Sequence, residues 1–266
     1  MPFPRIALRT VALAYLGALL VAPVAMVFWR TFEHGFGDAW AAVTTPAAKH
    51  AFLLTLVIAL IAVPANTIFG VVCAIAIVRH RFPGKDLVNA LVDLPLALSP
   101  IVVGLAFLLL YGRGGWLENL PFDVVFALPG MVLATIFVSL PFVVREVVPV
   151  LREIGTEQEQ AASTLGAGWW STFRRVTLPS IRWAVAYGVV LTTARSLGEF
   201  GAVSVVSGRI VGKTETMTLH VEERFQSFDY VGAYAASVVL ALLAIATLVA
   251  MSVFKPREGV SNGDRS

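Results

Sequence analysis

Two oppositely charged residues lie inside a long apolar stretch in the second half of the chain. Arg195 and Glu199 interrupt the run 182–206, which otherwise consists mostly of apolar and small residues. An arginine at the centre of a membrane-spanning helix costs about 2.5–3.5 kcal/mol on insertion scales, so its side chain must face protein or water. A spacing of four places both residues on one helix face, where they can pair. Two interpretations stay open: the pair fixes helix packing, or it lines the route of an anion.

The other reactive side chains form no catalytic or metal-binding pattern. The four histidines are scattered along the chain, and Cys73 is the single cysteine. These counts exclude a disulfide framework and a cysteine-based zinc cluster. Neither a GxSxG turn nor an HExxH helix is present. We therefore expect no catalytic residue, no metal site and no cofactor in this chain.

The elements that hold Arg195 and Glu199 are predicted to be membrane-spanning helices. Of the 266 residues, 58% are hydrophobic and only 14% are charged, which is more apolar than a soluble domain. Apolar runs of about 20 residues can cross a bilayer, and their backbone groups must be satisfied internally, which favours helices. Six such runs occur, at 6–29, 51–78, 87–111, 128–144, 182–206 and 231–254. The predicted class is an all-α integral membrane protein.

The distribution of basic residues predicts the orientation of these helices. With both termini inside, 13 basic residues face the cytoplasm and six face outward, and such an excess inside is the usual bias. The inner residues are Arg5, Arg9, Arg79, Arg81, Lys85, Arg145, Arg152, Arg174, Arg175, Arg182, Lys255, Arg257 and Arg265. The outer ones are Arg30, Lys49, Arg113, Arg209, Lys213 and Arg224. This asymmetry explains the basic composition, so we expect lipid and no nucleic acid as a partner.

The third apolar run contains two prolines near its start. Pro95 and Pro100 each remove a backbone donor, so we expect this helix to be kinked or locally unwound. Such breaks occur along transport pathways and also as purely structural kinks, and both interpretations stay open. Ser99, beside Pro100, offers its hydroxyl either to the freed backbone or to a ligand.

Two further patterns flank the charged pair. Ala194, Gly198 and Ala202 are four residues apart, which predicts a strip of small residues for close helix contact. After the fifth run, residues 216–228 have the apolar spacing of an amphipathic helix, which we place on the outer face of the membrane.

Between the fourth and fifth runs lies a polar stretch with its own helix signals. Thr156 and Glu159 have the spacing of a capping box, so a helix is predicted to begin at residue 157. It is predicted to end at Gly166, a residue that tolerates a left-handed turn. A second short helix is predicted over 169–176, before Pro179 at the foot of the next run. Two short helices joined by a glycine form a docking surface, here called the hairpin (residues 156–179).

The hairpin resembles the cytoplasmic loop of ABC-importer permeases, whose pattern is E-A-A, three residues, G, nine residues, I, one residue, L-P. The matching residues are Gln160, Ala161, Ala162, Gly166, Val176, Leu178 and Pro179, with every spacing kept. Gln160 replaces the glutamate, although Glu159 is adjacent, and Val176 replaces the isoleucine. The resemblance implies that Glu159, Gln160, Ala161, Ala162, Gly166, Leu178 and Pro179 couple the chain to an ATPase.

Two apolar segments extend the resemblance to permeases of sulfate and thiosulfate importers. These segments are LPLALSPIVVGLAFLLLYG (94–112) and ARSLGEFGAVSVVSG (194–208). The implied fold is that of a type I ABC-importer permease (MetI-like), with six transmembrane helices and a coupling-helix hairpin between helices 4 and 5. The implied domains are an N-terminal helix with its outer loop (1–50), a permease core (51–254) and a disordered cytoplasmic tail (255–266).

The implied function is that of a transmembrane permease subunit in the bacterial cell membrane. It would form half of the pathway for sulfate or thiosulfate, with Arg195, Glu199 and Ser99 as pathway residues. Its implied partners are a second permease subunit, two copies of an ABC ATPase that bind ATP and Mg²⁺, and an extracytoplasmic sulfate-binding protein. The alternatives are a molybdate or tungstate ABC permease and an ion-driven secondary anion carrier.

Overall fold

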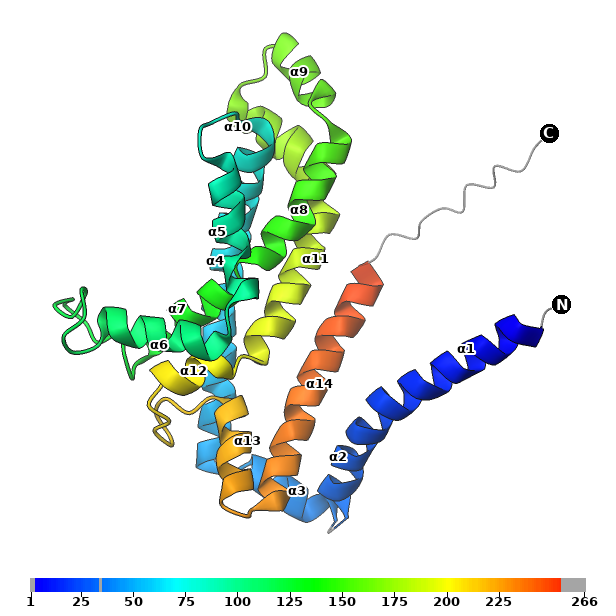
Figure 1. Cartoon of the computed structure of the whole chain (residues 1–266), viewed down its shortest axis with the longest axis vertical. Coiled ribbons are helices and arrows are strands. Elements are labelled where there is room, and N and C mark those ends of the chain that lie inside the picture. Colours follow the sequence, from blue (N-terminus) through cyan, green and yellow to red (C-terminus); the bar gives the residue numbers. More distant parts are fainter. Residues whose placement is uncertain (1–2, 34, 255–266) are drawn as a thin grey trace. The chain divides into compact units, whose positions relative to one another are not determined.

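Every regular element in residues 3–33 and 35–254, the part that the computed structural model describes, is a helix (Figure 1). The predicted tail, 255–266, lies outside the described residues. The elements are α1 (Phe3–Leu16), η1 (Gly17–Val21), α2 (Ala22–Phe32), α3 (Phe36–Val43), α4 (Pro46–Arg79), α5 (Lys85–Ala97), α6 (Pro100–Tyr111), α7 (Leu128–Ser139), α8 (Pro141–Ile154), α9 (Glu157–Thr164), α10 (Trp169–Thr172), η2 (Phe173–Thr177), α11 (Leu178–Leu197), α12 (Gly201–Val206), α13 (Met217–Gln226) and α14 (Tyr230–Phe254). Both η segments are π-helical turns. The all-helical prediction is confirmed for these residues.

Four helical segments are long and apolar enough to cross a membrane. They are Ala7–Phe32, Pro46–Arg79, Leu128–Ile154 and Tyr230–Thr247. A fifth span results if α5 and α6 count as one, although they meet at a bend of 110°. The predicted fifth run, 182–206, is not among them, since α11 carries charged residues near both of its ends and stops at residue 197. The count of six spans therefore stays a prediction.

The described residues divide into two compact units, and the first holds residues up to Thr55 together with Arg209–Leu243. Its N-terminal helix runs without a break through α1, η1 and α2, and the apolar side chains of this span are exposed within the chain. Pro23 lies just after η1. Because proline lacks an N–H and its ring crowds the preceding turn, a wider π-turn accommodates it. So long an exposed apolar helix is typical of contact with lipid.

The first unit also contains α13, which packs against α4 and α14. The backbone N–H of Met217 donates to the Thr55 hydroxyl of α4 at 2.9 Å. The Met217 side chain is buried with Ala51 of α4 and Ala236 of α14. The prediction of an amphipathic helix over 216–228 is confirmed at 217–226.

The second unit holds Leu56–Gly208 and the described residues from 244 onward, and its core lies between α4, α5, α8 and α11. The buried side chains are Val71, Cys73, Ala74, Ile77, Val92, Val143, Val144, Val147, Leu151, Ile181 and Ala184. Glycines bring the helices close together: an added Cβ would lie 2.6 Å from the Val143 Cβ at Gly70, and 2.9 Å from the Val143 Cα at Gly188. Small residues at helix contacts are typical of packing within membranes.

Two of the predicted spans are interrupted in the second unit. The break between α5 and α6 falls at Pro100, so the predicted kink is confirmed, while Pro95 stays inside α5. The prediction of one continuous helix over 182–206 is wrong, because α11 ends at Leu197 and α12 begins at Gly201. The short helices beyond the two breaks, α6 and α12, pack against each other and lie across the direction of α5 and α11 (Figure 1).

Candidate functional site

The turn of the hairpin has the predicted geometry. The helix α9 begins at Glu157, as predicted, and Gly166 adopts a positive φ of 82° after its last turn. The Gly166 N–H donates to the Ser163 carbonyl and the Ala167 N–H donates to the Ala162 carbonyl, both at 3.0 Å. These two bonds form a Schellman motif, which satisfies the last carbonyl groups of a helix.

The predicted capping box is wrong. Thr156 is the N-cap residue of α9, but its side chain makes no cap hydrogen bond; its hydroxyl accepts a bond from Nε2 of Gln160 at 3.1 Å. The Glu159 carboxylate points elsewhere: Oε1 accepts a hydrogen bond from the Thr177 hydroxyl at 2.8 Å, and Oε2 lies 2.9 Å from Nε of Arg79. Pairing between two charged groups is stronger than a bond to a neutral backbone N–H, which explains the choice.

Arg79, the last residue of α4, ties the base of the hairpin to the helix bundle. Besides its ion pair with the Glu159 carboxylate, its guanidinium donates to the Leu151 carbonyl at 3.0 Å and to the Gly155 carbonyl at 2.7 Å. These carbonyls belong to the end of α8 and the residue after it, where a helix leaves carbonyl groups without internal partners. One arginine therefore fixes the end of α8 and, through Glu159 and Thr177, both arms of the hairpin.

The second arm of the hairpin is continuous with the following helix. The sequence predicts a separate short helix over 169–176, whereas α10, η2 and α11 run without interruption from Trp169 to Leu197. Pro179 does not break this run, because the wider π-turn directly before it accommodates the proline ring and the missing N–H. The prediction of a separate helix is therefore wrong.

The tip of the hairpin exposes large apolar side chains. Leu165 is 89% exposed, and Trp169 and Trp170 are 75% and 60% exposed. Trp169 stacks on Phe173, with 6.1 Å between ring centroids and 11° between planes. Gln160 and Ala161 are exposed and Ala162 is half-buried, while Leu178 and Pro179 at the far end are also exposed. An exposed apolar patch of this kind is typical of interaction surfaces.

Arg195 and Glu199 form the predicted ion pair, with 2.7 Å between the guanidinium Nη2 and the carboxylate Oε2. The Glu199 side chain is buried, whereas 30% of the Arg195 side chain is exposed. The other carboxylate oxygen of Glu199 accepts the N–H of Ala202 at 2.9 Å, near the start of α12. The carboxylate thus bridges the last turn of α11 and the first turn of α12. Residues 195–201 are called the polar break below.

The polar break lies against the start of α6. An added Cβ at Gly201 would lie 2.7 Å from the Pro100 Cβ, and one at Gly104 would lie 2.7 Å from the Ala202 carbonyl oxygen. The predicted strip of small residues is wrong as one helix face, because Gly198 ends α11 and Ala202 belongs to α12. Ser99 is the N-cap residue of α6 but makes no side-chain cap hydrogen bond. The residue after Ser99, Pro100, lies against Gly201 of the polar break, two residues after Glu199.

Sequence reasoning missed two groups of residues. The sequence marks Arg79 only as an inner basic residue, and no local pattern links it to Glu159, which is 80 positions away. Thr192 and Ser196, one turn apart on α11, are buried, and neither hydroxyl has a hydrogen-bond partner within the described part of the chain. Because Thr192 and Ser196 are four residues apart and flank Arg195, their spacing indicates a second polar face on this helix.

Known proteins share this architecture over nearly the whole chain. Residues 66–259 match the family model of the "binding-protein-dependent transport system inner membrane component". The chain is 50% identical over 258 residues to "Sulfate transport system permease protein CysW" of Synechococcus elongatus, an alignment that covers 96% of this chain and 90% of that protein. It is 37% identical over 252 residues to the permease protein CysT of Escherichia coli, covering 93% and 91% of the two chains.

A solved structure gives the same fold. A bacterial alginate ABC transporter, in complex with its alginate pentasaccharide-bound periplasmic protein, aligns with a TM-score of 0.79 over 96% of this chain and 95% of that one. At 17% identity this likeness concerns the fold alone. The family model and the relatives confirm the resemblance to importer permeases. The chain belongs to the family of binding-protein-dependent transport-system inner membrane components.

Proposed function

We propose that this chain is the permease subunit of an ATP-driven sulfate importer and forms half of its translocation pathway. The observation that carries the proposal is the 50% identity to a sulfate transport permease over nearly the full length of both chains. The arrangement of the hairpin and the polar break supports it, since one suits docking and the other suits handling of an anion.

In this proposal the hairpin docks into a separate ATPase on the cytoplasmic side. Exposed Leu165, Trp169 and Trp170 supply apolar contact area, and the small side chains of Ala161 and Ala162 keep α9 slim enough to enter a groove. The hydrogen bonds of Arg79 hold the base of the hairpin, so that a push on the tip reaches the helix bundle. The ATPase must contact the hairpin differently in two states, because equal docking in both would transmit nothing.

The polar break is the proposed contact with the anion. The guanidinium of Arg195 has five N–H donors, and its partly exposed side chain leaves donors available for sulfate oxygens. Glu199, which is buried, neutralises and orients the arginine. The site therefore binds a dianion less tightly than an unpaired arginine would. The Ser99 hydroxyl, free of a cap bond, is the third proposed pathway group.

The proposed topology has six spans with both termini in the cytoplasm. Its fifth span is α11 and its third is the bent pair α5 and α6, so the hairpin lies between spans 4 and 5. This assignment follows the excess of basic residues in the inner connections. It places α13 and the connection before it on the outer side.

The proposed complex contains a second permease subunit, two copies of the ATPase and an extracytoplasmic binding protein. The existence of a second sulfate permease type, CysT, at 37% identity supports a pair of unlike permeases. A periplasmic protein bound to the alginate transporter supports a binding protein as the donor of substrate. ATP and Mg²⁺ would be held by the ATPase, so this chain needs no cofactor and performs no hydrolysis itself.

Sulfate, molybdate and tungstate share their charge and shape, so the site alone does not separate them. We propose sulfate as the substrate because the relatives are sulfate transport permeases. An ion-driven carrier would require neither a hairpin for docking nor a binding protein. Both alternatives remain outcomes of one transport experiment.

The test is uptake into proteoliposomes that contain the assembled complex. We expect uptake of labelled sulfate that needs ATP inside and binding protein outside, and competition by thiosulfate. Stronger competition by molybdate than by unlabelled sulfate would assign the chain to the molybdate importers. Uptake driven by an ion gradient without ATPase would overturn the proposal altogether.

The docking geometry has a separate test. A cysteine introduced by Ala162→Cys should cross-link to the ATPase and react with membrane-impermeant thiol reagents only from the cytoplasmic side. Reaction from the outside alone would overturn the proposed topology.

A further inference from the structure

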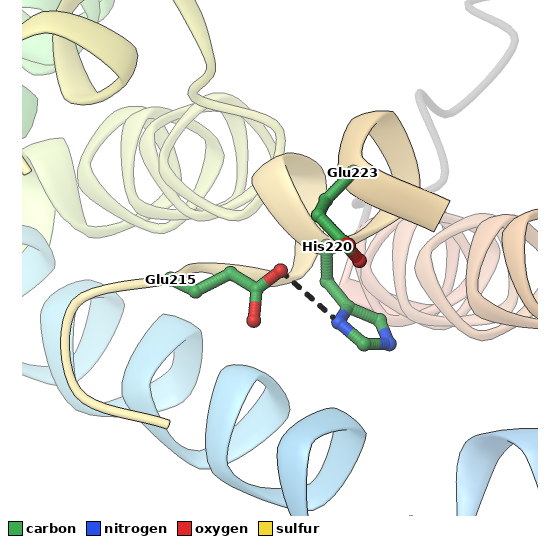
Figure 2. Close-up of side chains that lie close together, drawn as sticks. All are labelled: Glu215, His220 and Glu223. Carbon is green, nitrogen blue, oxygen red and sulfur yellow. Dashed lines mark hydrogen bonds and ion pairs between the residues drawn. The ribbon is translucent and has the colours of Figure 1, made fainter. Parts of the chain in front are cut away.

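Three metal-ligating side chains converge in the first unit, away from the polar break and the hairpin in the sequence. Figure 2 shows Glu215, at the end of the connection before α13, facing His220 and Glu223 of α13. His220 and Glu223 are three residues apart and therefore share a helix face. One ligand atom from each of the three residues lies within 4.8 Å of the others.

Burial sets this cluster apart from ordinary surface carboxylates. The side chains of Glu215 and His220 are each only 2% exposed. Glu215 Oε1 lies 3.2 Å from Nδ1 of His220, while Oε2 is buried without a hydrogen-bond partner in the described part of the chain. A buried carboxylate oxygen without a partner is costly, and a cation bound by the carboxylate would satisfy it.

The charge balance of the cluster leaves room for a divalent cation. Glu223 is partly neutralised by Arg224, whose Nε lies 3.2 Å from Oε2, and it accepts a hydrogen bond from the Ser227 hydroxyl at 3.0 Å. Arg224 is shared with Asp229, 3.6 Å away. Glu215 has no comparable arginine or lysine partner among the described ion pairs, which leaves only the imidazole of His220 beside it.

We propose that Glu215, His220 and Glu223 bind a divalent transition-metal ion, with Zn²⁺ as the favoured ion. An imidazole with two carboxylates is a nitrogen–oxygen ligand set, which suits Zn²⁺ better than it suits Ca²⁺ or Mg²⁺. Tetrahedral zinc with bonds of about 2.0–2.2 Å places its ligands roughly 3.4 Å apart. The Glu215–His220 separation of 3.2 Å already fits, and a modest rotation brings Glu223 into range. A water molecule completes the fourth position.

The backbone around the cluster is held in place, as a metal site requires. The N–H groups of Thr214 and Glu215 both donate to the Ile210 carbonyl, at 2.9 and 3.2 Å, and the Ile210 N–H donates to the Thr214 hydroxyl. The start of α13 is fixed to α4 through Met217 and Thr55. A bound ion would fasten the connection 209–216 to α13, on the side of the membrane where the proposed topology places the binding protein.

The test measures zinc bound to the purified, nucleotide-free complex after treatment with a chelator and addition of Zn²⁺ alone. We expect about one equivalent of zinc per permease chain, with at least a roughly tenfold loss of affinity in His220→Gln and in Glu215→Gln. Co²⁺ in place of zinc should give the visible absorption of a tetrahedral site, and His220→Gln should remove it. Zn²⁺ should also raise the unfolding temperature of the wild-type complex.

Glu222→Gln is the matched control. Glu222 lies on the same helix but pairs with Arg209 at 3.0 Å, outside the cluster, so its variant should bind zinc as the wild type does. If Glu215→Gln fails to assemble, His220→Gln still decides the question. Retention of zinc by His220→Gln would overturn the proposal, and so would a wild-type complex that binds no zinc at micromolar concentrations. In the latter case the contact between Glu215 and His220 is a proton-bridged pair only.

Discussion

The hairpin and the polar break each contain an ion pair between an arginine and a glutamate, but the more buried partner differs between the two. In each, a carboxylate pairs with an arginine and also accepts one further hydrogen bond: Glu159 from the Thr177 hydroxyl and Glu199 from the Ala202 N–H. At the hairpin the arginine is the more buried partner, since Arg79 is 11% and Glu159 22% exposed. At the polar break the carboxylate is buried, at 2%, and Arg195 is 30% exposed.

In each pair, the more buried partner holds neighbouring helices together. Arg79 gathers carbonyl groups from the end of α8 and is therefore the structural centre of the hairpin base. Glu199 joins α11 to α12 and is the structural centre of the polar break, and Arg195 is the proposed contact with the anion. At the polar break, loss of Glu199 should therefore damage assembly most, whereas at the hairpin base, which lies outside the helix bundle, loss of Arg79 should damage coupling to the ATPase.

The largest effect is expected at the polar break. Glu199→Gln leaves Arg195 without its counter-charge, and breaking a buried ion pair costs about 3–5 kcal/mol. We expect much less assembled complex, measured by gel filtration of the solubilised membrane protein. Arg195→Gln leaves the buried Glu199 carboxylate without its counter-charge but keeps its bond to the Ala202 N–H, so we expect a partial loss of assembly and a complete loss of sulfate uptake per assembled complex.

The double variant Glu199→Gln with Arg195→Gln separates the two interpretations of the pair. If Arg195 serves the anion, the double variant stays inactive even where assembly recovers. If the pair is only structural, the double variant regains both assembly and uptake. Normal uptake by an Arg195→Gln complex at wild-type level would exclude a role for Arg195 in the pathway.

The next largest effect is expected at the base of the hairpin. Arg79→Met leaves the Glu159 carboxylate without its counter-charge and two backbone carbonyls without their donor, at a cost of about 1–3 kcal/mol for each group that water does not reach. We expect uptake to fall while ATP hydrolysis by the complex persists, because the hairpin no longer transmits movement. Arg81→Met, at an exposed position two residues further on, is the control and should transport normally. An equal loss of uptake in both variants would show that the contacts of Arg79 are not required for coupling.

A smaller effect is expected where α6 crosses α12. Gly104→Ala places a Cβ 2.7 Å from the Ala202 carbonyl oxygen, and overpacking of this kind costs about 1–3 kcal/mol. The unfolding temperature of the complex should fall. Gly198→Ala is the control, since its added Cβ meets only the Ala194 carbonyl oxygen, at 3.6 Å. Equal stability of the two variants would show that the crossing is loosely packed.

The smallest effect on stability is expected at the turn of the hairpin. Gly166→Ala forces an L-residue into the left-handed region, at a cost of about 1–2 kcal/mol. Because the turn is surrounded by open space, insertion and assembly should be unchanged while transport becomes uncoupled from ATP hydrolysis. Gly168→Ala, in the same hairpin but with a φ of −69°, should behave as the wild type does. An unchanged ratio of uptake to hydrolysis in Gly166→Ala would contradict this prediction.

The same comparison explains what the sequence could predict. The pairing of Arg195 with Glu199, the turn at Gly166 and the kink at Pro100 all depend on residues a few positions apart, and periodicity or residue type reveals them. The pairing of Arg79 with Glu159 and the packing of Gly104 against Ala202 join residues 80 and 98 positions apart, which only the folded chain brings together. The capping box failed for the same reason, because a distant arginine competed successfully for the local carboxylate.

The unbroken helix from Trp169 to Leu197 has a mechanical consequence. The 26 residues between Trp169 and Arg195 span about 39 Å at a rise of 1.5 Å per residue. If a stiff rod of this length turns by about 5° about one end, its other end moves by roughly 3 Å, the length of one hydrogen bond. The rod stops at the polar break, so a slight rocking of the exposed tryptophans would move Arg195 by about the length of the hydrogen bonds that we propose it donates to the anion.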